Sequence, residues 1–252
     1  MLLDPKSKRP QLPHGRLVCG VLAAEHVGAV AVIAAIATSL IASARLRSGG
    51  WTKFAAATLA AILVAAELGW WIYLAATSAR DSDLATAIPL QLCDAAIFIA
   101  ALALLIRTQI LVEVTYFWGL AGTIQALITP DLPQHFPSFP FFQYYTAHGG
   151  IVTAALFLVV GLGQWPRRDA VLRVLAITIA YALVIGAIDA ATGANYLYLR
   201  SKPASGSLLD LLGPWPWYIA SAAVIAIALL LILDAPFRLF RRRRRGGAEG
   251  RI

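Results

Sequence analysis

Charged side chains are scarce in this chain of 252 residues, because Asp, Glu, Lys and Arg together make up only 13% of it. Soluble domains carry about 25% charged residues, since they need a polar surface whatever the size of their core. Hydrophobic residues reach 60% of the chain. This composition excludes a soluble globular domain, and it equally excludes intrinsic disorder. We therefore expect a polytopic membrane protein with a single domain.

Cysteine is almost absent, and the two cysteines, Cys19 and Cys93, exclude a disulfide framework. Common catalytic and cofactor motifs are missing too: there is no G-x-S-x-G elbow, no phosphate-binding P-loop and no dinucleotide fingerprint. The residues of a zinc-binding type are His26, His135, His148, Asp94 and Asp189. No H-E-x-x-H or C-x-x-C spacing supports a metal site among them. We expect neither a metal nor another cofactor.

Seven apolar segments are long enough to cross the ~30 Å hydrocarbon core of a membrane as helices. They lie at about residues 24–43, 54–77, 88–106, 110–128, 146–164, 170–191 and 216–234. The sequence therefore predicts an all-α fold, a polytopic membrane bundle of seven transmembrane helices. We divide the chain into an N-terminal tail at 1–23, the seven-helix domain at 24–234 and a basic cytoplasmic tail at 235–252. The first twenty residues show no cleavable signal peptide.

Lys and Arg are distributed unequally between the two sets of loops, and this inequality predicts the orientation. The side with the C-terminal tail carries twice as many of these cations as the other. We expect a multi-pass protein of the plasma membrane with its N-terminus outside and its C-terminus in the cytoplasm. The run Arg241–Arg245 is then an orientation anchor, although it would also suit acidic lipid head groups or a nucleic-acid arm. Because the net charge of +8 is concentrated in the last residues, we expect no nucleic-acid partner.

Polar residues inside the predicted spans gather near the outer face of the membrane. They are Glu25, His26, Cys93, Asp94, Gln125, His148 and Asp189, with Glu67 somewhat deeper. The cytoplasmic ends of the spans contribute almost no polar residue. Because polar groups in a membrane usually face the bundle interior or a cavity, this layer predicts a shared cavity that opens outward.

Two long outer loops are expected to close over the same layer. The loop between the fourth and fifth spans contains four prolines, which reduce the entropy lost on ordering, so we expect a fixed cap. The loop before the last span carries Arg200 and Lys202. These cations would either meet a phosphate or carboxylate head group or extend to the membrane interface without a ligand.

A thiol and an imidazole in one cavity form a nucleophile–base pair in principle. The histidine takes the thiol proton, and the thiolate attacks an ester carbonyl. We predict Cys93 as the nucleophile and His148 as the general base, with Asp94 or Asp189 as the orienting group. Gln125 or Asn195 would donate to the developing oxyanion. The alternative is that Cys93 is a small core residue and His148 a structural histidine.

Several short stretches of the sequence resemble a known family. They are PLQLCD at 89–94, Gln125 with TPDL at 129–132, HF and FFQYYTAHG within 135–149, GANYLYLRSKP at 193–203 and LLDLLGPWPWY at 208–218. Over roughly residues 20–235 the chain resembles the YwaF-like bacterial integral membrane proteins and their eukaryotic relatives, transmembrane protein 164. The resemblance implies a seven-helix membrane protein. It also implies acyl transfer on phospholipids by a cysteine and a histidine, which correspond by motif to Cys93 and His148.

The leading hypothesis is a lipid acyltransferase or acyl hydrolase of the outer leaflet that works through a thioester. Its partners would be membrane lipids, namely an acyl donor and a lysolipid acceptor. The predicted substrate-binding residues are Gln91, Gln125, Asn195, Tyr196, Arg200 and Lys202. The second hypothesis is a non-catalytic protein that binds or transports a lipid or solute, and the third is a scaffold in a larger assembly. Transport is disfavoured because a path needs polar positions in both halves of the membrane.

Overall fold

The structure, a computed structural model, describes residues 24–47, 49–77, 89–130, 132, 134–203 and 208–249, with side chains as far as Arg241. This part of the chain is helical and contains no strand, which confirms the all-α fold. The predicted N-terminal tail, with Cys19, lies outside the described residues. The helices are α2 (Ala24–Leu46), α3 (Gly50–Thr77), α5 (Leu92–Ile106), α6 (Gln109–Phe117), η1 (Trp118–Thr123), α7 (Ile124–Ile128), α8 (Phe139–Leu156), η2 (Phe157–Gly161), α9 (Ala170–Thr192), η3 (Tyr196–Tyr198), η4 (Leu208–Leu212) and α10 (Trp217–Glu249).

Six helical segments of the described chain are long and apolar enough to cross a membrane. They are Ala24–Leu46, Gly50–Thr77, Gln109–Ile128, Phe139–Gly161, Ala170–Thr192 and Trp217–Arg241. The remaining predicted span, at 88–106, corresponds to α5, which has 15 residues. At about 1.5 Å per residue α5 is roughly 22 Å long, which is shorter than the ~30 Å hydrocarbon core. The protein is therefore a multi-pass membrane bundle with a short helix inside it, and the count of seven spans stays a prediction.

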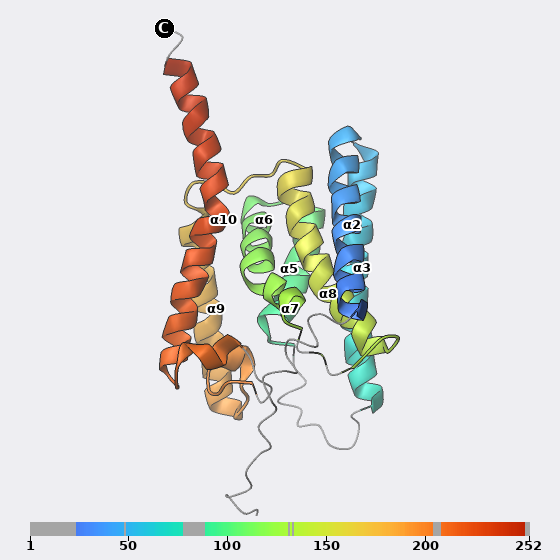
Figure 1. Cartoon of the computed structure of the whole chain (residues 1–252), viewed down its shortest axis with the longest axis vertical. Coiled ribbons are helices and arrows are strands. Elements are labelled where there is room, and N and C mark those ends of the chain that lie inside the picture. The colour runs from blue at the N-terminus through green and yellow to red at the C-terminus, as the bar shows by residue number, and fades with distance from the viewer. Residues whose placement is uncertain are drawn as a thin grey trace, which may run out of the picture.

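The helices are arranged in three groups (Figure 1). α2 and α3 lie on one side, α9 and α10 lie on the opposite side, and α5, α6, α7 and α8 lie between them. The turns that follow α2, α5 and α8 lie at one end of the bundle, which we call the basic end. The C-terminal end of α10 extends past the other helices at this end. The opposite end, which we call the cavity end, holds the starts of α2 and α5 and the segments 129–138 and 193–203.

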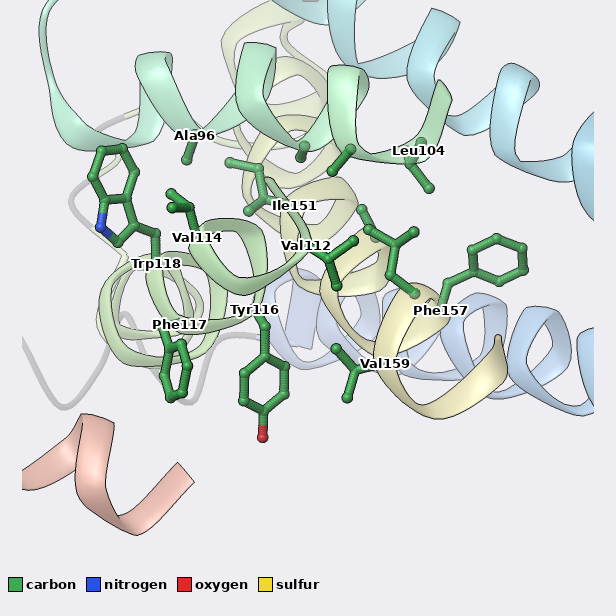
Figure 2. Close-up of a cluster of buried hydrophobic side chains, with 14 of the residues drawn as sticks. Ala96, Leu104, Val112, Val114, Tyr116, Phe117, Trp118, Ile151, Phe157 and Val159 are labelled. Atoms are coloured by element: carbon green, nitrogen blue, oxygen red, sulfur yellow. The ribbon is translucent and has the colours of Figure 1, made fainter. Parts of the chain in front are cut away.

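The largest cluster of buried side chains forms where α5, α6 and α8 meet (Figure 2). Ile97 of α5, Phe117 of α6 and Ile151 of α8 are each at most 1% exposed. Alanines supply much of the contact surface of α5. Because lipid tails are as apolar as these side chains, close van der Waals packing rather than the exclusion of water holds such helices together.

Two glycines of α8 bring neighbouring helices to within direct contact of its backbone. A Cβ atom at Gly149 would lie 2.6 Å from Ile33 Cδ1 of α2, and one at Gly150 would lie 2.7 Å from Leu63 Cδ2 of α3. Such distances are shorter than real Cβ contacts, so a methyl group at either position would require Ile33 or Leu63 to shift. The two glycines thus allow α2 and α3 to pack closely against α8.

The fourth predicted span is interrupted by the π-helical segment η1. A π-helical turn is wider than an α-helical one, and such turns are frequent near functional sites. η1 begins with Trp118, whose indole Nε1 donates a hydrogen bond to the Thr178 hydroxyl of α9 at 2.8 Å. This contact connects α9, which is otherwise sparsely buried, to the middle of the bundle.

α8 begins earlier than the span predicted at 146–164. Ser138 takes the N-cap position with an extended backbone, and Pro140 falls in the first turn, where its missing N–H leaves no helical hydrogen bond unmade. His148 therefore lies well inside its helix rather than near the start of the predicted span. α5 is short, and its first turn already lies deep in the bundle. Cys93, in this first turn, therefore lies at the same level as His148. Cys93 lies thirteen positions before Ile106, the last residue of α5, and His148 lies thirteen positions before Gly161, the last residue of η2.

A buried carboxylate lies at the basic end, where the sequence predicted almost no polar residue. Glu113 of α6 is 0% exposed, and it accepts hydrogen bonds from the Arg167 backbone N–H at 2.9 Å and from Arg173 Nη2 at 3.0 Å. Asp234 of α10 is equally buried and forms an ion pair with Arg238. The prediction that this end of the spans contributes almost no polar residue was therefore wrong for Glu113 and Asp234. The argument against transport, which depended on this prediction, therefore fails as well.

Candidate functional site

A cavity of about 330 Å³ lies at the cavity end, between α3, α5 and α8. Its lining residues are Glu67, Trp70, Cys93, Asp94, Ile97, Leu132, Gln134, Pro140, Gln143, Tyr144, Ala147 and His148. Leu132 and Gln134 come from the proline-containing segment 129–138. That segment therefore forms part of the wall, in the position expected of a cap.

The start of α5 holds Cys93 and Asp94 in a defined arrangement. Gln91 is the N-cap residue, and its backbone N–H donates to Asp94 Oδ2 at 3.0 Å, which satisfies one of the free N–H groups at the helix start. The other oxygen, Asp94 Oδ1, accepts a hydrogen bond from the Cys93 thiol at 3.6 Å. Both oxygens of this carboxylate are thus used by its own helix.

The imidazole of His148 is oriented by the backbone of its own helix. Nδ1 lies 2.8 Å from the carbonyl oxygen of Tyr144. A carbonyl oxygen only accepts, so Nδ1 carries the hydrogen, and in the neutral ring Nε2 holds the lone pair. The ring also packs against that of Tyr144, with centroids 4.2 Å apart, and the Tyr144 hydroxyl donates to the Ala126 carbonyl oxygen at 2.9 Å.

Cys93 and His148 line the same cavity, and in the described part of the chain no hydrogen bond joins them. The thiol is directed to Asp94, and the imidazole to Tyr144. Asp94 therefore does not orient His148 in this arrangement. A nucleophile–base contact would need the Cys93 side chain to rotate away from Asp94.

The cavity also contains polar residues outside the predicted site. Glu67 of α3 is only 1% exposed, and its Oε1 accepts a hydrogen bond from Trp71 Nε1 at 2.9 Å. Gln143 of α8 faces the cavity, and its amide has no hydrogen-bond partner among the residues that the structure describes. The position of Glu67 in a long apolar run marked it in the sequence. Gln143 had no such signal, because it sits at a helix start that the sequence assigned to a loop.

Asp189 and the residues that follow α9 form a compact turn beside the cavity wall. Asp189 is 0% exposed, and its Oδ1 accepts from the Tyr196 backbone N–H at 2.9 Å. Asn195 Oδ1 accepts from the backbone N–H groups of Arg200 and Ser201 at 2.9 and 3.0 Å. The side chains of Asp189 and Asn195 thus stabilise the turn, and neither lines the cavity.

The other predicted substrate-binding residues also lie outside the cavity lining. Arg200 Nη1 donates to the backbone carbonyl of Asp189 at 3.1 Å, and Lys202 lies 3.7 Å from Asp210 and over the Tyr218 ring. Gln91 has a connecting role, because its Oε1 accepts from the Leu197 backbone N–H at 3.0 Å. It therefore joins the 193–203 segment to the start of α5. The remaining two predicted residues, Gln125 and Tyr196, do not line the cavity either.

A metal centre has no support in the described residues, since no three His, Cys, Asp or Glu side chains among them lie close enough to share an ion. What the cavity offers is a thiol, an imidazole, two carboxyl groups and an amide. This set can perform proton transfer and nucleophilic attack on a carbonyl group.

The fold and the cavity define a multi-pass helical membrane protein with a small polar cavity toward one end. A model of the TMEM164 family matches residues 21–234, which is most of the chain, so the protein belongs to the TMEM164 family. This confirms the resemblance given by the sequence motifs. No match was found among curated proteins or among solved structures.

Proposed function

We propose that the protein transfers acyl groups between lipids in the cavity, with Cys93 as nucleophile and His148 as general base. The observation that carries the proposal is that a thiol and an imidazole with its Nε2 lone pair available line one cavity. The cavity volume of about 330 Å³ suits the ester region and part of a head group rather than a whole lipid. The acyl chains would extend between the helices into the membrane.

In the first half-reaction, the Cys93 thiol rotates from Asp94 toward His148 and gives its proton to Nε2. The sulfur attacks the ester carbonyl of a donor phospholipid, and the ester C–O bond breaks. The lysolipid leaves with the proton from the imidazolium, and the acyl group stays on Cys93 as a thioester.

In the second half-reaction, the hydroxyl of an acceptor lysolipid gives its proton to His148 and attacks the thioester. The C–S bond breaks, the acyl group passes to the acceptor, and the thiol regains the proton. Water in place of the lysolipid would make the same site an acyl hydrolase.

Within this proposal the oxyanion donor is Gln143, because its unpaired amide faces the cavity while Gln125 and Asn195 lie outside the lining. Asp94 accepts the thiol hydrogen bond at rest. We also propose that the cavity end faces the outside of the plasma membrane, since this orientation places the arginine-rich end of α10 in the cytoplasm.

The test is acyl transfer from a labelled phospholipid to a lysolipid by the full chain in vesicles. Cys93→Ala should lower the rate at least 100-fold, since the covalent step is lost. A hydroxylamine-sensitive acyl adduct should form on the wild type and be absent from the variant. Cys19→Ser is the matched control, and it should keep both the rate and the adduct. A Cys93→Ala rate equal to that of the wild type would overturn the proposal.

A second candidate function is lipid or solute binding without covalent chemistry. The observation that favours it is the Cys93–Asp94 hydrogen bond at 3.6 Å, which directs the thiol away from the imidazole. An electrophilic acyl probe distinguishes the two functions. Binding alone predicts that Cys93 stays unlabelled and that Cys93→Ala retains bound lipid, whereas acyl transfer predicts labelling.

A further inference from the structure

The last helix continues well beyond the part that crosses the membrane. α10 has 33 residues, which is about 50 Å of helix at 1.5 Å per residue, against a hydrocarbon core of ~30 Å. Figure 1 shows its C-terminal end projecting past the other helices at the basic end. The segment that is long and apolar enough to cross a membrane ends at Arg241. The four further arginines, Arg242–Arg245, therefore follow it directly in a continuous helix.

The base of this extension is fixed to the turn between η2 and α9. Arg241 Nη2 donates a hydrogen bond to the Pro166 carbonyl oxygen. One helical turn earlier, Phe237 is 9% exposed, and its ring contacts those of Tyr116 and Trp165, with centroids 5.6 and 5.9 Å apart. The first arginine of the run thus has a set position beside the 162–169 turn, and the rest of the run continues from it.

The carboxylates of this end are already occupied. Glu113 is paired with Arg167 and Arg173, and Asp169 is also paired with Arg173. Asp234 is paired with Arg238. In the part of the chain with described side chains, no carboxylate is left at this end to neutralise further cations. The described carboxylates of this end therefore do not balance the charge of the arginine run.

Aromatic and charged side chains also lie next to one another at this end, as they do at a membrane interface. Trp165 is 39% exposed and Phe240 is 54% exposed, and their rings lie 6.0 Å apart. Arg168, next to this pair along the turn, is exposed and makes no ion pair within the described residues. Exposed aromatic rings beside Arg168 match the boundary between acyl chains and phosphate groups.

We infer that the basic end binds anionic phospholipid head groups between the α10 extension and the 162–169 turn. Arg168 and the arginine run supply the positive charge that attracts the phosphate groups, and Trp165 and Phe240 contact the glycerol and upper acyl region. Basic surfaces beside transmembrane helices bind such head groups in general. The inference does not depend on the chemistry of the cavity, which lies at the opposite end of the bundle.

The test uses the full chain in detergent with phosphatidylglycerol or phosphatidylcholine added, and native mass spectrometry counts the bound lipids. The wild type should retain phosphatidylglycerol in preference to phosphatidylcholine. The triple variant Arg243→Gln, Arg244→Gln, Arg245→Gln should lower this preference at least tenfold, since each arginine near an anionic surface contributes roughly fivefold. The matched control is Arg45→Gln, Arg47→Gln, Lys53→Gln, which removes three charges from the same end beside α2 and α3. It should change the preference less than threefold.

Equal losses in the two triple variants would show attraction by net charge alone and would overturn the site. An unchanged preference in the first variant would overturn it as well. Replacing chloride by inorganic phosphate at equal ionic strength should not displace the lipid more than chloride does. Selective displacement by phosphate would indicate a site for free phosphate and would overturn the lipid assignment.

Discussion

The carbonyl oxygen of Tyr144 accepts the Nδ1 hydrogen of His148 at 2.8 Å, one helical turn away on α8. A backbone group rather than a carboxylate therefore sets the orientation and the tautomer of this imidazole. The acceptor stays in place whatever side chain stands at position 144. The consequence is that the function of His148 can be tested without disturbing its anchor.

His148→Asn should separate a catalytic role from a structural one. The Asn amide keeps a donor near the position of Nδ1 but has no basic nitrogen in place of Nε2. If His148 is the general base, acyl transfer should fall by about 10²- to 10⁴-fold while the thermal unfolding midpoint in detergent stays close to that of the wild type. Cys93→Ser is the companion variant, and it should fold equally well. A His148→Asn protein with wild-type turnover would contradict the proposed base.

Gly149→Ala should destabilise the bundle by about 1–3 kcal/mol, because the new methyl group would lie 2.6 Å from Ile33 Cδ1 and would force α2 away from α8. Gly28→Ala is the matched control on α2, since no heavy atom lies within 4 Å of a Cβ at that position. The control should be neutral or slightly stabilising. Thermal unfolding of both proteins in the same detergent measures the difference, and equal midpoints would contradict the packing described for α8.

Glu113→Gln should destabilise the protein by about 2–3 kcal/mol. Loss of one partner of a fully buried pair costs about 3–5 kcal/mol, but Arg167 and Arg173 are 50% and 27% exposed, so water stabilises the unpaired cations in part. Asp169→Asn removes a carboxylate that is 59% exposed, and it should cost less than about 1 kcal/mol. Denaturant titration of the two variants should rank them in this order. A reversed order would contradict the central place of Glu113 in the cluster.

Glu25→Ala should expose the cavity to reagents. The Glu25 carboxylate lies 2.5 Å from His135 Nδ1 and accepts the Phe136 backbone N–H at 3.2 Å, so it holds the segment 129–138 against α2. Without it, the wall formed by Leu132 and Gln134 loses its attachment. In a Cys19→Ser background, a maleimide should label Cys93 several times faster in Glu25→Ala than in the parent.

Thr38→Ala serves as the control for this labelling experiment, because Thr38 bonds only within α2, to the Ala34 carbonyl oxygen. Its labelling rate should equal that of the parent. Equal rates in Glu25→Ala and Thr38→Ala would mean that the Glu25 contacts do not close the cavity.

The apolar runs predicted most of the helices, because a long apolar segment has few other solutions in a membrane. Helix ends were less predictable. The run FPFFQYY looked like a loop, yet Ser138 and Pro140 form the start of α8. The 88–106 span became a shorter helix, since α5 begins only after its N-cap residue Gln91. Such starts depend on local capping that hydropathy does not register.

The candidate site, like the helices, was predicted from the sequence only in part. Cys93, Asp94 and His148 lie on the cavity wall, whereas Asp189, Asn195 and the two nearby cations bond to the 193–203 segment or to neighbouring residues. The sequence places residues by depth, but depth does not say toward which neighbour a side chain turns. The Glu113 cluster was missed because it depends on contacts between distant segments, and Gln143 was missed because its helix start was assigned to a loop.

Glu113 receives its cations from residues 54 and 60 positions later in the chain. At the ordinary speed of translation, about 5–20 residues per second, the ribosome needs roughly 3–12 s after making Glu113 to reach Arg173. During this interval the cations that pair with Glu113 do not yet exist. The ion pairs around Glu113 can therefore form only after the 162–169 turn and the start of α9 have been synthesised, so this cluster closes late in the biogenesis of the bundle.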